Sequence, residues 1–278
     1  MRHVHFGIIA ATLGILVWFP TFTPVRAETL SIPPVTQRTH VWCWIAVIEM
    51  VARYHDVPNV NPAGVYQCGI VGLLALGGSS NQCAYECRLC TVPAGSAQNL
   101  GVALEEYPRR ARVVTGRLVR DIVGDYQSRP LDPDEIVEEI DDENPIIAGI
   151  SPSGRPPQFT SEHVALIVGY ERDGDILIVN DPYPFPPSVW ADPYLAAGAR
   201  EVIAGRYRIR YDTFVERLQW KETITTSSVG RRRPSSLPSY CCTNLGRLGP
   251  YPNTSVPPGG PCHGTLPNGV PATGRACY

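Results

Sequence analysis

The sequence predicts an α+β protein, because helical patterns come first along the chain and strand patterns come later. Apolar residues in segment 41–54 recur at the spacing of one helix face. Further along, two β-rich runs flank the turn sequence Arg-Asp-Gly-Asp of residues 172–175, which is typical of a hairpin. Hydrophobic residues make up 44% of the 278 residues, enough to fill a core. This order of elements favours two lobes.

Three segments are predicted to be helices. Residues 41–54 place apolar side chains on one face, and residues 97–107 form a second, shorter helix pattern. The third helix begins with the sequence Asp-Pro-Asp-Glu of residues 132–135 and runs to about residue 140. That sequence provides an N-cap, a proline at the first helical position and an acidic residue three positions after the cap.

The strand patterns predict an antiparallel sheet in the second half of the chain. Residues 68–90 are rich in glycine and cysteine and are expected to form a loop region instead. The expected strands are residues 112–118, 146–150, 164–170, 176–179, 201–211 and 220–225.

The N-terminus has the pattern of an export signal. Arg2 precedes an apolar run over residues 6–19, and the sequence Val-Arg-Ala of residues 25–27 puts small residues at the positions that precede cleavage. The apolar run is shorter than the roughly 20 residues that span a membrane, and no later segment is long and apolar enough to do so. We therefore expect residues 1–27 to be a cleaved signal peptide, and the mature protein to be secreted or periplasmic without a membrane anchor.

The nine cysteines fit an oxidising compartment, where they pair as disulfides. Cys43 stands alone, and a leftover cysteine in an exported protein is an intermolecular partner or a reactive thiol. Cys87 and Cys90 also have the spacing of zinc ligands, but export favours disulfides, so no metal is predicted. Within each group of four the pairing is open among three connectivities. The two groups are Cys68, Cys83, Cys87 and Cys90, and Cys241, Cys242, Cys262 and Cys277.

The composition changes after residue 225, which divides the chain into a main unit and an appendage. Residues 28–225 have the patterns of a folded unit, and residues 226–239 form a polar linker without apolar periodicity. Residues 240–278 are rich in proline, glycine and cysteine, and are too short for a core without covalent cross-links. They are predicted to form a small disulfide-held module.

The charge balance excludes some classes of partner. With 24 Lys and Arg against 26 Asp and Glu, the formal net charge is −2. Loss of Arg2 and Arg26 with the signal peptide takes this to −4. No basic field indicates a nucleic-acid partner, and the sequence assigns no oligomeric state.

Cys43 has the setting of a nucleophile. It stands where the helix 41–54 begins, and the positive end of the helix dipole stabilises a thiolate there. Gln37 lies six residues earlier in the loop that leads into this helix, where its amide is available to donate to an oxyanion.

A general base is expected at His163. This residue opens a predicted strand directly after a loop, whereas His55 lies at the far end of the Cys43 helix, about 18 Å away at 1.5 Å per residue. The hairpin returns to Asn180 and Asp181, so both ends of the hairpin meet at one edge of the sheet. Asp181 is the predicted orienting group for the imidazole, with Asn180 as the alternative.

These motifs together resemble the papain-like cysteine peptidases, above all the bacterial branch of secreted effector and bacteriocin-processing peptidases. The resemblance implies a two-lobe fold with the cysteine helix in the first lobe and a β-sheet in the second. It also implies a peptide or protein substrate and no cofactor. The motifs are Gln37-x5-Cys43-Trp44, the sequence Glu-His-Val-Ala-Leu-Ile-Val-Gly-Tyr of residues 162–170, and Ile-Val-Asn-Asp-Pro of residues 178–182.

Carried onto this chain, the resemblance implies that Cys43 is the nucleophile and His163 the base. Asp181 then orients the imidazole, and Gln37 helps to form the oxyanion hole. The chain departs from papain before the nucleophile, where His-Val-Trp of residues 40–42 replaces a glycine and a small residue. The sequence therefore predicts an exported thiol protease, a hydrolase with a Cys-His-Asp triad, over residues 28–225.

Two other functions fit the same residues. The same triad supports acyl transfer to amines, as in transglutaminases. Alternatively, the chain is a non-catalytic, disulfide-rich binding protein on the same scaffold, with Cys43 bridging to another chain.

Overall fold

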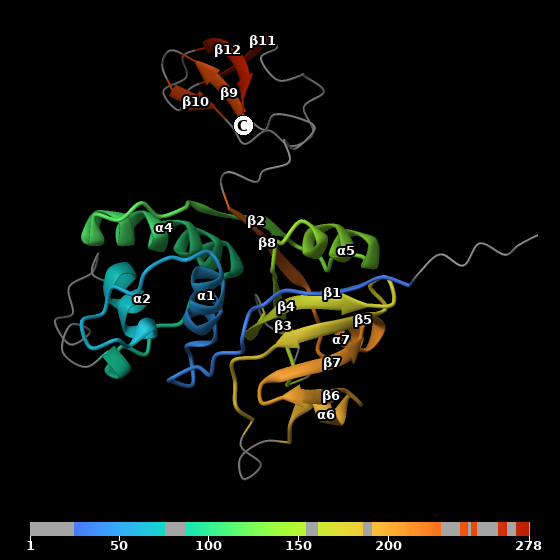
Figure 1. The fold of residues 1–278 in the computed structure, drawn as a ribbon. Coiled ribbons are helices and arrows are strands. Elements are labelled where there is room, and N and C mark those ends of the chain that lie inside the picture. Colours follow the sequence, from blue (N-terminus) through green and yellow to red (C-terminus); the bar gives the residue numbers. More distant parts are fainter. Residues whose placement is uncertain are drawn as a thin grey trace, which may run out of the picture.

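The computed structural model has an α+β fold with the elements of a helical lobe beside those of a sheet lobe (Figure 1). It describes residues 25–75, 87–153, 161–185, 191–228, 240–243, 246–248, 261–265 and 271–277. The predicted fold class is confirmed. Residues 1–24 of the predicted signal peptide, Cys83, and residues 229–239 of the predicted linker lie outside the described residues.

The helical lobe is built around α1 (Cys43–Tyr54), with α2 (Tyr66–Ala75), α4 (Ala97–Thr115) and the short 3-10 helix η1 (Cys87–Leu89) about it. Every residue of α1 from 44 to 52 is buried. A helix that is buried all round lies inside the protein rather than on its surface. The N-terminus of α1 is therefore held rigidly by the core.

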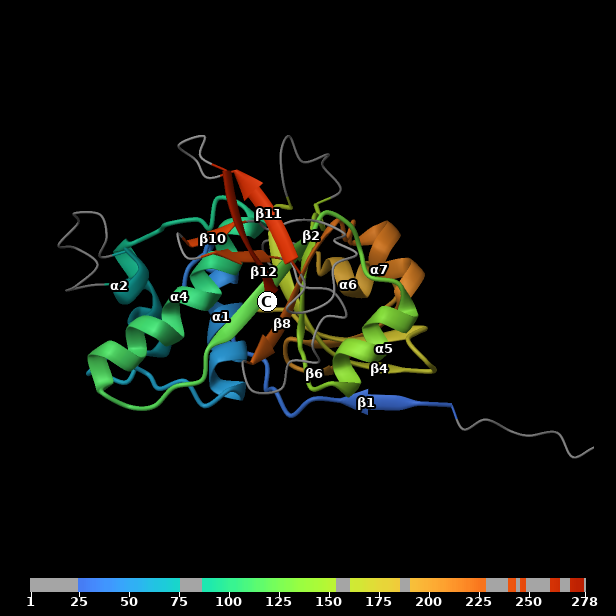
Figure 2. The same ribbon diagram turned by 90° about the horizontal axis from the view of Figure 1, so that it is seen from above.

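The sheet lobe is an antiparallel sheet of eight strands in the order β2-β8-β3-β4-β5-β7-β6, with β1 paired to β4. Figure 2 shows the same separation from above, with α1, α2 and α4 on one side and α5, α6 and α7 on the other. The strands are β1 (Ala27–Thr29), β2 (Ile122–Gln127), β3 (Ile146–Ile150), β4 (His163–Glu171), β5 (Ile176–Asn180), β6 (Arg200–Ile203), β7 (Arg206–Arg210) and β8 (Glu222–Ser228).

Three helices accompany the sheet: α5 (Pro133–Asp141), α6 (Pro193–Ala196) and α7 (Tyr211–Arg217). The capping signal read from residues 132–135 is confirmed. The side chain of Asp132 accepts a hydrogen bond from the backbone of Glu135, whose own side chain accepts one from the backbone of Asp132.

The expected loop over residues 68–90 is wrong for its first part, which forms α2. Gly69 and Gly72 suggested a loop, but Ile70 and Val71 are fully buried and hold the segment against the core. A Cβ atom at position 69 would lie 2.9 Å from Oδ1 of Asn59, so this glycine permits a close approach of the helix to its neighbour.

The expected strand over residues 112–118 is also wrong, because α4 continues to Thr115. Val113 and Val114 favour a strand by propensity, yet they lie exposed on the last turn of a helix whose earlier turns are buried. The helix ends at Gly116, which adopts a left-handed φ of 64° and donates its N–H to the carbonyl of Arg112. The strand of this region is β2, which follows seven residues later.

The first strand begins at Ala27, the last residue of the predicted signal peptide. Glu28 pairs with Tyr170, and the N–H of Leu30 donates to the carbonyl of Val168 at 2.7 Å. Residues 28–30, which follow the predicted cleavage point, are thus held on β4 by backbone pairing.

The strands near the C-terminus form a sheet of their own, in the order β10-β9-β12-β11. Cys262 in this sheet is disulfide-bonded. These strands are β9 (Tyr240–Thr243), β10 (Gly246–Leu248), β11 (Pro261–Thr265) and β12 (Pro271–Cys277).

Candidate active site

The thiol of Cys43 stands at the first position of α1, between two tryptophans anchored to the same loop. The indole N–H of Trp42 donates to the carbonyl of Cys90 at 2.9 Å, and that of Trp44 donates to the carbonyl of Val92 at 3.0 Å. Trp42 is fully buried and Trp44 is 7% exposed. Both residues that flank Cys43 are thus fixed by hydrogen bonds in addition to packing.

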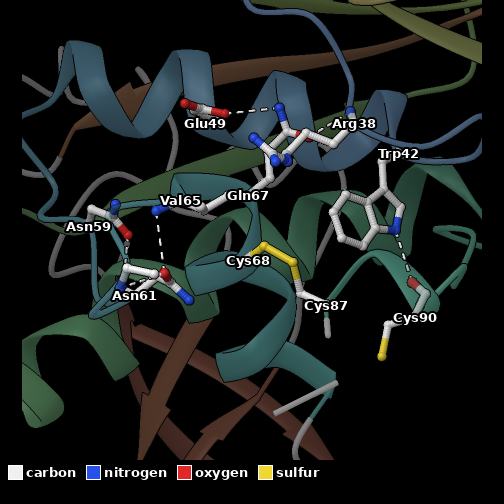
Figure 3. Close-up of a disulfide and its surroundings, with 11 residues drawn as sticks. Arg38, Trp42, Glu49, Asn59, Asn61, Val65, Gln67, Cys68, Cys87 and Cys90 are labelled. Carbon is white, nitrogen blue, oxygen red and sulfur yellow. Dashed lines mark hydrogen bonds between the residues drawn. A yellow bond between two sulfur atoms is a disulfide. The ribbon is translucent and has the colours of Figure 1, made fainter. Parts of the chain in front are cut away.

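A disulfide anchors the segment that leads into the loop of Cys90 and Val92. Cys68 of α2 is bonded to Cys87 of η1, and Figure 3 shows this disulfide beside the Trp42 indole that points at Cys90. Cys90 is disulfide-bonded as well, whereas Cys43 is a free, half-buried thiol. Cys68, Cys87 and Cys90, all predicted as disulfide candidates, are thus disulfide-bonded in the structure.

His163 opens β4, the strand expected to carry the base. It pairs with Ile150 of β3, in the interior of the sheet, and its side chain is 11% exposed. Nε2 of the imidazole lies 2.8 Å from Oδ1 of Asp181. The hairpin of β4 and β5 therefore brings His163 and Asp181 together, as the turn sequence predicts.

The carboxylate of Asp181 is fully buried and has three hydrogen-bond partners. Besides His163, Oδ1 accepts from the backbone N–H of Tyr183, and Oδ2 accepts from the hydroxyl of Tyr194 at 2.8 Å. Tyr194 is itself fully buried and stacks on Tyr207, with ring centroids 4.2 Å apart. The orientation of Asp181 is consequently set by a packed aromatic layer.

The Cys43 thiol and the His163 imidazole shift each other's pKa in opposite directions. Burial acts to raise the pKa of Cys43, but the hydrogen bond and charge of His163 outweigh it. Backbone hydrogen bonds from Val164 and Trp44 add to this, so the pKa of the thiol is lowered. Burial acts to lower the pKa of His163, but Asp181 and Cys43 outweigh it and hold that pKa well above its usual value. Both shifts favour transfer of the thiol proton to the imidazole.

Gln37 lies in the loop before α1 and is 7% exposed. Its backbone N–H donates to the carbonyl of Pro182, which ties this loop to the residue after Asp181. Its amide Nε2 donates to the carbonyl of Thr39 at 2.7 Å, while Oε1 has no partner among the described residues. The amide carries two hydrogens, and its role in an oxyanion hole stays a prediction.

Replacement of Gln37 tests that role. We expect Gln37→Met to lower kcat by about 10²–10³ with little change in KM, because an oxyanion donor acts only in the transition state. Methionine keeps the volume but removes both donors. Steady-state kinetics give the loss, and the alkylation rate of Cys43 serves as control and is expected to be unchanged. An unchanged kcat contradicts the assignment.

Asn180 points elsewhere. Its amide Nδ2 donates to the carbonyl of Ile32, and its Oδ1 accepts from Nε of Arg206, both at 2.8 Å. It is fully buried and links β5 to the N-terminal segment. Of the two candidates for the orienting residue, Asp181 is the one that contacts the imidazole.

Two cavities meet beside the pair of Cys43 and His163. The first has a volume of about 350 Å³ and lies toward α4, and the second has a volume of about 480 Å³ and lies toward Tyr183 and Phe185. Both are lined by His40, Glu162 and His163. Volumes in this range are typical of ligand sites. Cys43 lines the first cavity, and His163 lines both.

Several residues of this site were not found by sequence reasoning. Tyr194 is signalled only by the helix-starting sequence Asp-Pro before it, which predicts a short helix but not its contact with Asp181. Glu222 lies nearly sixty residues after His163 in the sequence. Its position beside the site depends on the pairing of β8 with β3. No sequence pattern joins these segments.

Within the part of the chain that the structure describes, no group of three or more His, Cys, Asp and Glu side chains is arranged to hold a metal ion. In that part, too, no helix is both long and apolar enough to cross a membrane.

The buried helix α1 begins with a free cysteine, Cys43. Strand β4 of the sheet begins with His163, which is hydrogen-bonded to Asp181. This combination is typical of the papain-like cysteine peptidases. The resemblance seen in the sequence is confirmed. The model of the family described as "Peptidase_C39 like family" matches residues 29–208. Because this match covers more than half of the chain, the protein belongs to that family. Among curated proteins, none matches the chain.

Proposed function

We propose that the protein is an exported cysteine peptidase that hydrolyses peptide bonds with Cys43, His163 and Asp181. The observation that carries the proposal is the 2.8 Å hydrogen bond between the imidazole of His163 and the buried carboxylate of Asp181, with the thiol of Cys43 and that imidazole on the wall of the same cavity. Because Asp181 engages Nε2, the hydrogen bond to the thiol is left to Nδ1 of the same ring.

In the first half of the reaction the Cys43 thiolate attacks the carbonyl carbon of the scissile bond. The resulting oxyanion accepts hydrogen bonds from the amide of Gln37 and from the backbone N–H of Cys43. Collapse of this intermediate breaks the C–N bond, and the His163 imidazolium gives its proton to the leaving amine. A thioester on Cys43 and a neutral imidazole remain.

In the second half His163 takes a proton from water, and the hydroxide attacks the thioester carbonyl. The C–S bond breaks, which restores the thiolate and the imidazolium and releases the carboxylic acid. Asp181 keeps the ring in the same orientation in both halves and stabilises its protonated form.

Export is supported by the N-terminal sequence pattern and by the disulfides. The Cys68–Cys87 bond and the disulfide-bonded state of Cys90 are typical of proteins that fold in an oxidising compartment. Secretion or residence in a periplasm both fit this chemistry.

Alkylation of the native, unreduced protein tests the proposal. We expect iodoacetamide to modify Cys43 at pH values well below 8.5, the ordinary thiol pKa, because the lowered pKa leaves the thiolate populated there. The rate is expected to rise as the pH increases through the lowered pKa and then to level off. Peptide mapping locates the adduct, and cleavage of an unfolded protein substrate by the same samples is expected to fall in step with it.

The outcomes separate the alternatives. Cleavage that persists after complete alkylation of Cys43 contradicts the proposal. If Cys43 is alkylated as expected, but the unmodified protein cleaves no substrate and instead transfers an acyl group to an added primary amine, the protein is an acyltransferase. A Cys43 that is found disulfide-linked, or that reacts only after unfolding, indicates a binding protein.

A further inference from the structure

We propose that the cavity between Cys43 and α4 receives an arginine or lysine side chain of the substrate, with Glu222 as its acceptor. This rests on the proposed function and specifies the substrate class of the same site. The cavity of about 350 Å³ has the thiol and the imidazole of the catalytic pair on its wall. The described residues on the rest of its wall include Trp44, Pro93, Leu100, Ser161, Glu162 and Glu222.

Glu222 is a nearly buried carboxylate that no described cation neutralises. It is 9% exposed, and its two oxygens accept three hydrogen bonds: Oε1 from the hydroxyl of Tyr126, and Oε2 from the N–H and the hydroxyl of Ser161. All three donors are neutral. A buried carboxylate without a positive partner is costly, and a cationic ligand removes that cost.

A second carboxylate, Glu162, stands at the rim. It is exposed, accepts hydrogen bonds from the backbone and the hydroxyl of Ser153, and lines both cavities. Among the described residues that line the cavity there is no lysine or arginine. The N-terminus of α4, capped by Ser96, contributes about half a positive elementary charge. That is smaller than the charge of two carboxylates, so the cavity favours a cation.

The remaining wall suits the stem of a basic side chain. Lysine and arginine lay their methylene groups on apolar surface while the charged head reaches polar groups. Trp44, Pro93 and Leu100 provide such surface between the thiol and α4. Hydrogen bonds between a guanidinium or ammonium and a carboxylate are stronger than those between neutral groups.

Glu222 also has a structural role, which the test must separate from recognition. Its carboxylate holds Ser161, two residues before His163. The packing there is close, because a Cβ atom at Gly149 would lie 2.6 Å from Oγ of Ser161. A purely structural role predicts that loss of the charge affects every substrate equally, whereas recognition predicts a selective loss.

The experiment compares peptides that differ only in having arginine or norleucine at one position beside the scissile bond, with each position scanned in turn. At one position we expect the wild-type protein to prefer arginine. Glu222→Gln is expected to lower kcat/KM for that arginine peptide on the order of 30-fold or more, and to lower it by a much smaller factor for the norleucine peptide. Glu216→Gln, an exposed carboxylate on α7, is the matched control and is expected to change neither.

Binding to the Cys43→Ala protein provides a readout that does not depend on turnover. We expect the Cys43→Ala protein to bind the arginine peptide more tightly than the norleucine peptide. In the double variant that also carries Glu222→Gln, we expect the two peptides to bind equally. If Glu222→Gln does not fold, Glu162→Gln at the exposed rim is expected to weaken the preference by a smaller factor. Equal binding of the two peptides by the Cys43→Ala protein, or equal losses for both peptides in Glu222→Gln, overturns the inference. A preference in binding without hydrolysis by the wild type instead overturns the proposed function.

Discussion

Cys43→Ala is expected to remove all measurable peptide hydrolysis while leaving the fold intact. The thioester cannot form without the sulfur, and no neighbouring group replaces it in the mechanism. Alanine is the best helix former and Cys43 is the first residue of α1, so the helix is retained. We expect the free energy of unfolding to fall by no more than about 1 kcal/mol, which corresponds to a fall in Tm of about 2–4 °C in a domain of this size. Calorimetry and a cleavage assay measure the two effects.

The same variant reports on the electrostatic pairing. The thiolate of Cys43 is one of the groups that raise the pKa of His163, so its removal is expected to lower that pKa, which NMR titration of the imidazole measures. Cys43→Ser is the matched control, because its hydroxyl keeps the size of the group but does not ionise near neutral pH. Hydrolysis by either variant at the wild-type rate would falsify the nucleophile assignment.

The catalytic hairpin was predictable from the sequence because everything that forms it is local. Arg172 and Asp173 take left-handed φ values of 52° and 53° before Gly174 in the tight turn, and the two β-rich runs that flank it pair with each other. His163 and Asp181 lie at the open end of this hairpin, so their meeting follows from its topology. The capping box of α5 was predictable for the same reason.

The misassigned segments show where local patterns stop being sufficient. Val113 and Val114 have strand propensity, but they follow sixteen residues of a helix that Ser96 caps and that the core holds. Extending that helix by one more turn adds a hydrogen bond for each residue, which outweighs a weak preference. In α2 the burial of Ile70 and Val71 likewise outweighs the neighbouring glycines.

The walls of the site could not be derived, because they come from segments that are distant in the chain. Leu100 of α4, Glu162 before β4 and Glu222 of β8 line one cavity only after the two lobes have packed together. A backbone hydrogen bond from Gln37 to the carbonyl of Pro182 holds Gln37 close to the end of β5, where Asp181 lies. Sequence spacing carries no record of such contacts, so specificity is readable only from the folded protein.

Asp181→Ala is expected to lower kcat/KM by about 10²–10⁴, the range that a positioned acid–base group contributes. The variant frees His163 from its 2.8 Å contact and removes the negative charge that raises the pKa of the imidazole. The pKa of His163 then falls, and the less protonated ring no longer lowers the pKa of Cys43 as strongly. The pH range in which thiolate and imidazolium coexist is therefore expected to narrow from both sides, as measured by the pH profile of kcat/KM.

Two conservative variants separate charge from shape at this position. Asp181→Asn keeps an acceptor for Nε2–H but loses the charge, so we expect a smaller loss in rate with the same narrowing of the pH profile. Tyr194→Phe keeps the carboxylate and removes one donor to it, so we expect a change of less than about tenfold, comparable to the loss of a single hydrogen bond. Asp181→Ala also leaves the buried Tyr194 hydroxyl without its partner, which costs about 1–3 kcal/mol of stability. A wild-type pH profile in both Asp181 variants would show that another group orients His163, since the charge of this carboxylate is what sets the upper limit of the active range.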